Sequence, residues 1–233
     1  MRALILAAGR GERMRPLTDV TPKPLLQVGG KPLIVHHIEK LAAIGVHEIV
    51  INTAHLTARF PERLGDGERW GVHLHYSAEG EIPLETGGGM LHAMRLLGGD
   101  PFLLVNGDVW TDYDFARLPR EPEGVAHLVL VAVPPEKPRG DFALGADGRV
   151  RTHGAPLLTY AGIGSYRPQV LEGWRKVVGA AQGASEDPPR FALAPILRGW
   201  MAHEAISGEH HHGGWCDVGT PERLAMLDAR LRA

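Results

Sequence analysis

Two glycines and three arginines follow the first apolar run of the sequence, at residues 3–7. The run leads into Ala8-Gly9-Arg10-Gly11-Glu12-Arg13-Met14-Arg15. Glycines allow backbone amides to approach a phosphate or a base closely, and guanidinium groups match the geometry of phosphate oxygens. The segment lacks the third glycine of a dinucleotide-binding fingerprint and the Gly-Lys-Ser/Thr of a Walker loop. It therefore indicates a phosphate-binding turn of another kind, with a flexible turn carrying solvated arginines as the alternative.

A single lysine, Lys23, lies between Pro22 and Pro24. Each proline fixes its own φ angle, and Pro24 also disfavours the helical region for the residue before it. We therefore expect Lys23 to be held in an extended conformation, with its ammonium group directed at a phosphate. Taken alone, the same residue would be an ordinary solvated lysine in a proline-rich turn.

Two aspartates stand where a carboxylate could share a cation with phosphate oxygens. Asp108 follows the apolar run 102–106, and Asp217 stands just before Thr220 and Pro221, which have the character of a helix start. Carboxylate oxygens are ligands that Mg²⁺ prefers. The alternatives are a turn at the end of a strand for the first aspartate and a structural acid for the second.

Alternating strand and helix patterns must position these residues. Apolar runs indicate buried strands, and amphipathic stretches with stop signals indicate helices between them. The expected strands are 3–7, 48–52, 72–77, 102–106 and 128–133, and the expected helices are 31–44, 57–64 and 86–97, the last capped by Thr86. This order predicts a mostly parallel mixed sheet. Ligands bind beyond the carboxyl ends of such strands, so the glycine-rich turn and Asp108 should share one edge.

The alternation weakens after residue 134. The expected strands there are 142–144 and 158–166, and the expected helices lie near 169–178, 191–203 and 221–231. The stretch 179–190 is rich in Gly, Ala and Pro and predicts a mobile loop. No internal repeat or clear linker interrupts the chain, so we expect one Rossmann-like α/β domain over residues 1–233.

Composition narrows the classes of function. The 233 residues are 44% hydrophobic and 22% charged, with a formal net charge of -2. Without a basic surplus no nucleic-acid partner is expected, and no apolar run is long enough to span a bilayer, so no membrane partner is expected either. The single cysteine, Cys216, excludes an internal disulfide and fits a reducing compartment, which favours the cytoplasm. The run His210–His212 is interpreted as a solvated loop, because adjacent histidines do not share a helix face.

The segment Leu6-Ala7-Ala8-Gly9-Arg10-Gly11-Glu12-Arg13-Met14, followed by Pro22-Lys23-Pro24-Leu25, resembles the signature of the sugar-phosphate nucleotidyltransferases, which have a glycosyltransferase-A-like fold. Trp215, Asp217, Gly219 and Thr220 match a Trp-x-Asp-x-Gly-Thr stretch of the same family. The resemblance implies that the glycine-rich turn wraps a nucleoside triphosphate and that Arg13 and Lys23 contact its phosphates. It also implies that Asp108 and Asp217 bind Mg²⁺, and that Arg13, Lys23 and Asp108 are the catalytic residues.

The resemblance implies two sets of binding residues as well. The nucleotide set is Leu6, Ala8, Gly9, Gly11, Glu12, Arg13, Lys23, Thr86, Gly87 and Asn106, and the sugar set is Asn106, Gly140, Asp141 and Gly162. The glycine-rich start of the helix at 86–97 is interpreted as room for a ligand. The glutamine that relatives often carry shortly before this helix is missing. Residues 152–156 stand where many relatives carry an acid and a lysine for the sugar, and Glu136-Lys137-Pro138 lies too early to be matched with that stretch.

The implied reaction joins a nucleoside triphosphate to a sugar 1-phosphate and releases pyrophosphate. UTP and N-acetylmuramate 1-phosphate are the favoured pair. The choice of UTP is what the resemblance implies, whereas the choice of sugar also has a physical reason, because the lactyl ether of muramic acid needs room. The missing acid and lysine and the small residues Gly140, Ala161 and Gly162 would leave that room. The alternatives are glucose 1-phosphate with dTTP or UTP, mannose 1-phosphate with GTP, and a non-catalytic sensor of nucleotide sugars. The sensor is disfavoured because all four charged residues of the signature are present.

Overall fold

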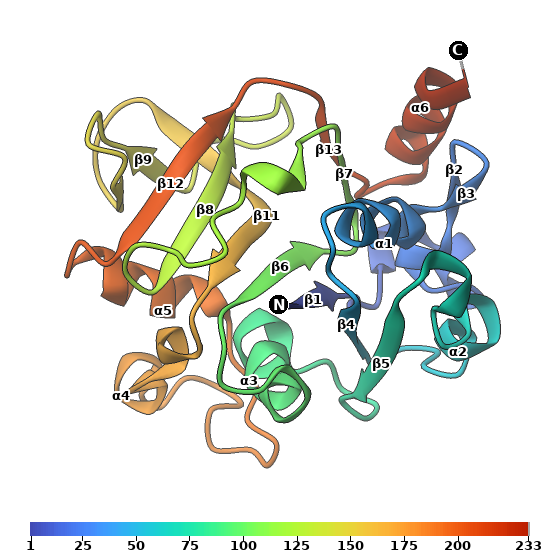
Figure 1. Cartoon of the computed structure of the whole chain (residues 1–233), viewed down its shortest axis with the longest axis horizontal. Helices are drawn as coiled ribbons and strands as arrows, with labels where there is room; N and C mark the ends of the chain where they lie inside the picture. The colour runs from blue at the N-terminus through green and yellow to red at the C-terminus, as the bar shows by residue number, and fades with distance from the viewer. Residues whose placement is uncertain (233) are drawn as a thin grey trace.

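Four parallel strands form the first half of a nine-stranded sheet in the computed structural model, which describes residues 1–232 (Figure 1). They are β1 (Arg2–Leu6), β4 (Glu48–Thr53), β5 (His73–Ala78) and β6 (Phe102–Asn106). β1 lies between β4 and β6, and Leu6 is in register with Asn52 on one side and Asn106 on the other. The carboxyl ends of three strands are therefore aligned at one edge, as the sequence predicted.

Mixed pairing extends the sheet beyond β6. The strands there are β8 (Ala126–Val131), β9 (Phe142–Leu144), β10 (Val150–Arg151), β11 (Leu157–Tyr166) and β12 (Ile206–His211). β11 is antiparallel to β6 and to β8, whereas β12 is parallel to β8. The register between β11 and β8 shifts between Tyr160 and Gly164, where Gly162 has a φ of +72°. The expected mixed sheet with parallel central strands is confirmed.

Helices cover both faces of the parallel strands (Figure 1). They are α1 (Leu33–Ala43) and α2 (Arg59–Leu64) on one face, and α3 (Glu85–Leu97), α4 (Trp174–Val178) and α5 (Leu193–Met201) on the other. The last helix, α6 (Pro221–Arg232), packs apart from these strands in a small separate core. Ala3 and Ile5 of β1 share one core with α1 and α2, while Leu4 shares a second core with α3, α4 and α5. This division follows from the two-residue period of a strand. Within residues 1–232, none of the helices has the length and apolar character needed to cross a membrane.

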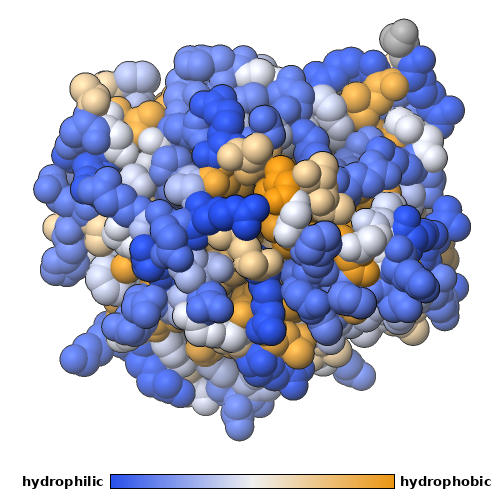
Figure 2. Space-filling view, in the orientation of Figure 1, coloured by the Kyte–Doolittle hydropathy of each residue, from blue (hydrophilic) through white to orange (hydrophobic). Residues whose placement is uncertain are grey.

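The two cores hold most of the large apolar side chains of the chain. On the face shown in Figure 2, hydrophilic residues predominate and apolar residues appear in small separate groups. This is the surface expected of a domain that buries its apolar residues between a sheet and the helices on both sides.

One short strand pairing and one small core attach the C-terminal segment to the rest. β2 (Gln27–Val28) pairs with β3 (Lys31–Pro32), and β7 (Val109–Thr111) pairs with β13 (Trp215–Asp217). Val28 packs with Val218 and Leu227 in a third small core. Because β7 closely follows β6, its pairing with β13 brings the C-terminal segment to the edge where β6 ends.

Two expected helices differ in detail. Thr86 is not a cap, because it is the second residue of α3 and its hydroxyl accepts a hydrogen bond from the Leu193 amide at 2.9 Å. The helix expected at 169–178 is interrupted at Gly173, whose φ is +67°, and so consists of a 3-10 turn at Pro168–Leu171 followed by α4. The stretch 179–190 contains no helix or strand, as expected, and its mobility stays a prediction.

The interpretation of the histidine run as a solvated loop is wrong for His210 and His211. Both belong to β12, which pairs along its length with β8. The strand was missed because most of its side chains are polar. One of these polar side chains, Glu209, accepts hydrogen bonds from Tyr113 and Arg117, which lie far from it in the sequence.

Candidate active site

The glycine-rich turn leaves the carboxyl end of β1 and curves toward Lys23. Gly11 has a φ of +63°, and a Cβ there would lie 2.9 Å from Thr18 Cγ2 and 3.2 Å from Lys23 Cβ. The Thr18 hydroxyl donates a hydrogen bond to the Gly11 carbonyl at 2.9 Å. Met14, at the end of the 3-10 turn Glu12–Met14, is fully buried. Glycine is therefore required at position 11 by both conformation and space, and the turn is anchored on both sides.

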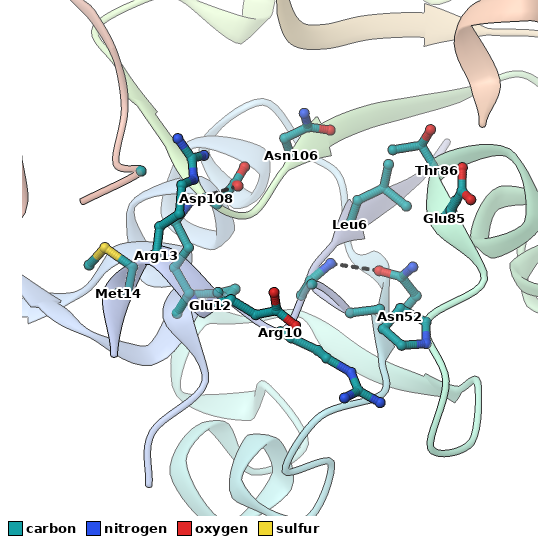
Figure 3. Close-up of a pocket in the computed structure, with 18 residues that line it drawn as sticks. Leu6, Arg10, Glu12, Arg13, Met14, Asn52, Glu85, Thr86, Asn106 and Asp108 are labelled. Carbon is teal, nitrogen blue, oxygen red and sulfur yellow. Dashed lines mark hydrogen bonds and ion pairs between the residues drawn. The ribbon is translucent and has the colours of Figure 1, made fainter. Parts of the chain in front are cut away.

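A cavity of about 550 Å³ lies between this turn, the ends of β1 and β6, and the start of α3 (Figure 3). Apart from Gly87, the predicted nucleotide-binding residues line it: Leu6, Ala8, Gly9, Gly11, Glu12, Arg13, Lys23, Thr86 and Asn106. Gly87 donates its amide hydrogen to the Phe191 carbonyl instead, and a Cβ on it would lie 2.6 Å from the Phe191 ring. The structure thus gathers the turn, Lys23 and Thr86 around one space and places Gly87 behind its wall.

Two buried polar side chains that the sequence did not single out hold the far side of this cavity. Asn52 accepts a hydrogen bond from the Ala7 amide at 2.6 Å (Figure 3). It also donates one to Glu79 at 2.5 Å. Glu79 also accepts one from the Leu84 amide at 2.8 Å, and burial raises the pKa of this carboxyl. The pair ties β1, β4 and the segment before α3 together. A polar residue in β4 and an acid directly after β5 were the signals in the sequence.

The glycine run at the start of α3 makes room for the protein itself. A Cβ at Gly88 would lie 2.4 Å from the Pro189 carbonyl oxygen, and one at Gly89 would lie 2.5 Å from the Glu79 carboxylate. The interpretation of this run as room for a ligand is therefore wrong. The three glycines let α3 approach its own neighbours closely.

Lys23, Asp108 and Asp217 meet where β7 and β13 pair. Lys23 Nζ lies 2.8 Å from Asp108 Oδ2 and 3.6 Å from Asp217 Oδ1, and only 7% of the lysine side chain is exposed. Arg13 lies 3.9 Å from the second carboxylate oxygen of Asp217. The register of the small sheet places Asp217 opposite Val109, the residue after Asp108. Four predicted site residues are thus brought together by pairing between segments about a hundred residues apart.

Lys23 is not extended, contrary to expectation. It begins the 3-10 turn Lys23–Leu25, in which the Leu25 amide donates a hydrogen bond to the Pro22 carbonyl at 2.8 Å. The bias that Pro24 places on the preceding residue is outweighed by this turn and by the burial of Leu25. The ammonium group is fixed by burial and by two carboxylates rather than by an extended backbone.

The two aspartates fit a magnesium ion that is shared with a substrate. Both carboxylates reach the same ammonium group, so they face one small region. Among residues 1–232, no group of three or more His, Cys, Asp or Glu side chains gathers as a complete metal site. Mg²⁺ usually takes one or two protein carboxylates and completes its shell with waters and phosphate oxygens. The donor set therefore suits such an ion and does not suit a metal held by protein ligands alone.

A second cavity, of about 400 Å³, adjoins the first at Arg13, Asn106 and Asp108. Its further lining comes from β7, β11, β13, α6 and the loop after β8: Val109, Pro134, Glu136, Lys137, Pro138, Thr159, Tyr160, Ala161, Trp215, Asp217 and Arg223. Trp215 Nε1 donates a hydrogen bond to the Ala161 carbonyl at 2.9 Å, which fixes the indole against β11. Asp108 lines both cavities and Asp217 lines the second, so the two carboxylates lie where the cavities adjoin.

The predicted sugar-binding residues do not all line this second cavity. Asn106 lines it, and Asp141 lines a smaller third cavity that also reaches Asn106. A Cβ at Gly140 would lie 2.7 Å from the Leu158 amide nitrogen, and one at Gly162 would lie 2.5 Å from Asn106 Nδ2. Both glycines are therefore required by close packing, and Gly162 leaves space for the Asn106 side chain.

An acid and a lysine do line the second cavity, contrary to expectation. Lys137 Nζ pairs with Asp141 at 2.5 Å, and Glu136 pairs with Arg223 at 3.0 Å. They come from the loop after β8, earlier in the chain than residues 152–156, where they were sought. Loop folding rather than sequence position brings them there. The supposed absence of an acid and a lysine therefore gives no support to the choice of sugar.

The chain resembles known proteins over nearly its whole length. The Nucleotidyl transferase family model matches residues 2–152. The N-acetylmuramate alpha-1-phosphate uridylyltransferases of Neisseria meningitidis serogroup B and Caulobacter vibrioides are 50% and 34% identical to it, and each alignment covers 98% of this chain and 97% and 96% of the relative. A candidate glucose-1-phosphate thymidylyltransferase from Bacillus anthracis, solved with sucrose, matches the structure with a TM-score of 0.83 at 23% identity, over 100% of this chain and 96% of that one. This last match concerns the fold alone, and it confirms the expected fold class.

Proposed function

Because the chain belongs to the nucleotidyl transferase family, we propose that it transfers a uridylyl group from UTP to N-acetylmuramate 1-phosphate and releases pyrophosphate. The names of the Neisseria and Caulobacter relatives support this substrate pair, since both align over nearly their full length. The observation that carries the proposal is the meeting of Lys23, Asp108 and Asp217 at the boundary of two adjoining cavities. The first cavity takes the nucleotide and the second takes the sugar phosphate.

The nucleophile is an oxygen of the sugar phosphate. The second pKa of a phosphate monoester is about 6, so this group is already largely ionised at neutral pH and needs no general base. The main obstacle is repulsion between two polyanions. Catalysis then consists of alignment and of neutralising charge at the α-phosphate and the leaving pyrophosphate.

The charged residues at the boundary have separate roles in this scheme. Lys23 presents a buried, fixed ammonium group to the phosphates, and the exposed Arg13 contacts them from the glycine-rich turn. Asp108 and Asp217 hold Mg²⁺, which when bound supplies positive charge to the phosphate oxygens. Backbone amides of the turn approach the nucleotide closely because Gly9 and Gly11 carry no side chain.

This activity belongs in the cytoplasm, where UTP is available, and it would return a cell-wall sugar released from peptidoglycan to the nucleotide-activated pool. The single cysteine agrees with a reducing compartment.

A matrix of nucleoside triphosphates against sugar 1-phosphates tests the proposal. Purified protein is incubated with Mg²⁺ and each pair, and pyrophosphate release and the nucleotide sugar are measured. UTP with N-acetylmuramate 1-phosphate should give the highest kcat/KM, at least about tenfold above UTP with N-acetylglucosamine 1-phosphate. A higher value for glucose 1-phosphate or for mannose 1-phosphate with GTP would overturn the substrate pair, and no pyrophosphate with any pair would overturn the enzymatic role.

A further inference from the structure

A third cavity branches from the junction of the first two. Its volume is about 170 Å³, and it shares Leu6, Thr86 and Asn106 with the first cavity and Asn106 and Tyr160 with the second. It runs between the sheet and α5, which lies on the α3 side of the sheet (Figure 1). The hydrogen bond from the Leu193 amide to the Thr86 hydroxyl holds the start of α5 against the start of α3. A group attached to a sugar near Asn106 can therefore enter this branch.

The branch has an apolar floor and two charged groups at its wall. Leu104, Phe142, Leu193 and Leu197 are buried. One charged group, Asp141, is already engaged, because its Oδ2 accepts hydrogen bonds from Lys137 Nζ at 2.5 Å and from the Tyr160 amide at 3.0 Å. The remaining charge is the guanidinium of Arg198.

Among the cationic side chains that line the second and third cavities, Arg198 is the one that has no acidic partner within residues 1–232. Four cationic side chains line the second and third cavities: Arg13, Lys137, Arg198 and Arg223. The other three pair with carboxylates: Arg13 with Asp217, Lys137 with Asp141, and Arg223 with both Glu136 and Asp217. Within residues 1–232, the Arg198 side chain has neither an ion pair nor a hydrogen bond. Its guanidinium lies 5.9 Å from the centre of the Phe142 ring, which places it at the wall of the branch.

We propose that this branch takes the lactyl ether of the sugar and that Arg198 binds the lactyl carboxylate. The inference rests on the proposed function. A guanidinium forms two parallel hydrogen bonds with a carboxylate, and the buried floor suits the lactyl methyl group. N-acetylglucosamine 1-phosphate lacks the lactyl group, so Arg198 distinguishes the two sugars by a charge that only one of them carries.

The test compares wild-type protein with Arg198→Met, with UTP saturating and each sugar phosphate varied. The kcat/KM for N-acetylmuramate 1-phosphate should fall at least about tenfold, while that for N-acetylglucosamine 1-phosphate should stay within about twofold. N-acetylglucosamine 1-phosphate is also measured as a competitive inhibitor, which reports its binding independently of turnover. Arg198→Glu should lower the use of the muramate further by repulsion and still spare the other sugar. Arg175→Met is the matched control, because Arg175 is an exposed arginine of α4 that stacks on Trp174 and lines none of the three cavities.

The outcomes separate the two proposals. A wild-type preference that persists unchanged in Arg198→Met overturns the arginine assignment and leaves the proposed function intact. An equal fall for both sugars also overturns it, because a general defect is not recognition of the lactyl group. If wild-type protein does not use N-acetylmuramate 1-phosphate, the proposed function fails and this inference falls with it. Thermal melting monitors folding, and Arg198→Gln provides the same test if the methionine variant melts early.

Discussion

Lys23 is the most enclosed charge of the candidate site. Its ammonium group lies against Asp108 and within 3.6 Å of Asp217, so one buried cation is shared by two carboxylates. A buried charge is stable only when it is paired, and this arrangement supplies that pairing. Because Lys23 occupies the region that a metal would share with the aspartates, the lysine and the metal should compete for the same carboxylate oxygens.

Replacing Lys23 with alanine should separate these two effects. Turnover should fall because the activation free energy rises by roughly 3 kcal/mol, the size associated with losing one preorganised charge contact. The apparent affinity for Mg²⁺ should rise, because the two carboxylates lose their competing cation. Steady-state rates over a Mg²⁺ titration measure both effects. Lys31→Ala is the control, since Lys31 pairs with Glu39 at the surface, and a near-normal rate for Lys23→Ala would contradict the role.

Asp108→Asn and Asp217→Asn keep the shape of each side chain and remove one negative charge. Each change should abolish most Mg²⁺-dependent activity, with partial recovery at high Mg²⁺ or with Mn²⁺, because a hard cation loses an anionic ligand. Pyrophosphate release across a metal titration measures this. Full activity of Asp217→Asn at low Mg²⁺ would show that Asp217 is only a structural acid that anchors Arg13 and Arg223.

At the scale of elements, α3 can occupy its position because the glycines at its start have no side chains. Gly87, Gly88 and Gly89 let the helix start approach Phe191, Pro189 and Glu79. The sequence displayed the cost of three glycines in a helix but not the identity of their neighbours. Those neighbours lie in the segment 179–191 and after β5, and only tertiary packing brings them to α3. A ligand and a protein neighbour therefore leave the same trace in the sequence.

Gly89→Ala tests the link between α3 and the nucleotide cavity. The new Cβ would lie 2.5 Å from Glu79 Oε1 and 2.6 Å from Asn52 Nδ2, so the buried pair must move. Overpacking of this kind costs about 1–3 kcal/mol. The melting temperature should fall, and KM for UTP should rise because Asn52 no longer holds the Ala7 amide. Gly99→Ala, which meets no atom within 4 Å, should change neither quantity, and an unaltered Gly89→Ala protein would refute the coupling.

The local part of the site was predictable and the long-range part was not. The glycine-rich turn and Lys23 stand close together in sequence, and their motif identifies them directly. Asp217 was identified by the Trp-x-Asp-x-Gly-Thr resemblance, but no local pattern displays the pairing of β13 with β7 that brings it to Asp108. Glu136 and Lys137 were dismissed by position, yet the loop after β8 places both at the second cavity. β12 was missed because an edge strand with polar side chains has no apolar alternation.

At the scale of the whole molecule, each half of the sheet lies beside the cavity proposed for one of the two substrates. The parallel half ends at the first cavity, whereas β11 of the mixed half lines the other two and β9 lines the third. Asn106 and Asp108 follow β6, where the two halves meet, since β6 pairs in parallel with β1 and antiparallel with β11. This seam also depends on α1, because His37 of α1 contacts the Val109 carbonyl, one residue beyond Asp108, at 2.7 Å.

Stability of the whole fold should depend on pH through His37. The ring is buried and stacked on Phe115, and its burial lowers its pKa from 6.5 to about 4. Between those values the unfolded chain binds a proton that the folded chain does not, so the free energy of unfolding falls as pH decreases from about 6.5 to about 4. A shift of this size corresponds to about 3 kcal/mol. Urea unfolding at pH 7.5 and at pH 4.5 measures this loss of unfolding free energy. The His37→Gln side chain can still donate to the Val109 carbonyl but does not titrate, so the loss in this variant should be smaller than in wild-type protein by about that amount. His73→Gln, at an exposed position of β5, should follow the wild-type curve, and an identical pH dependence for His37→Gln and wild-type protein would exclude His37 as the source.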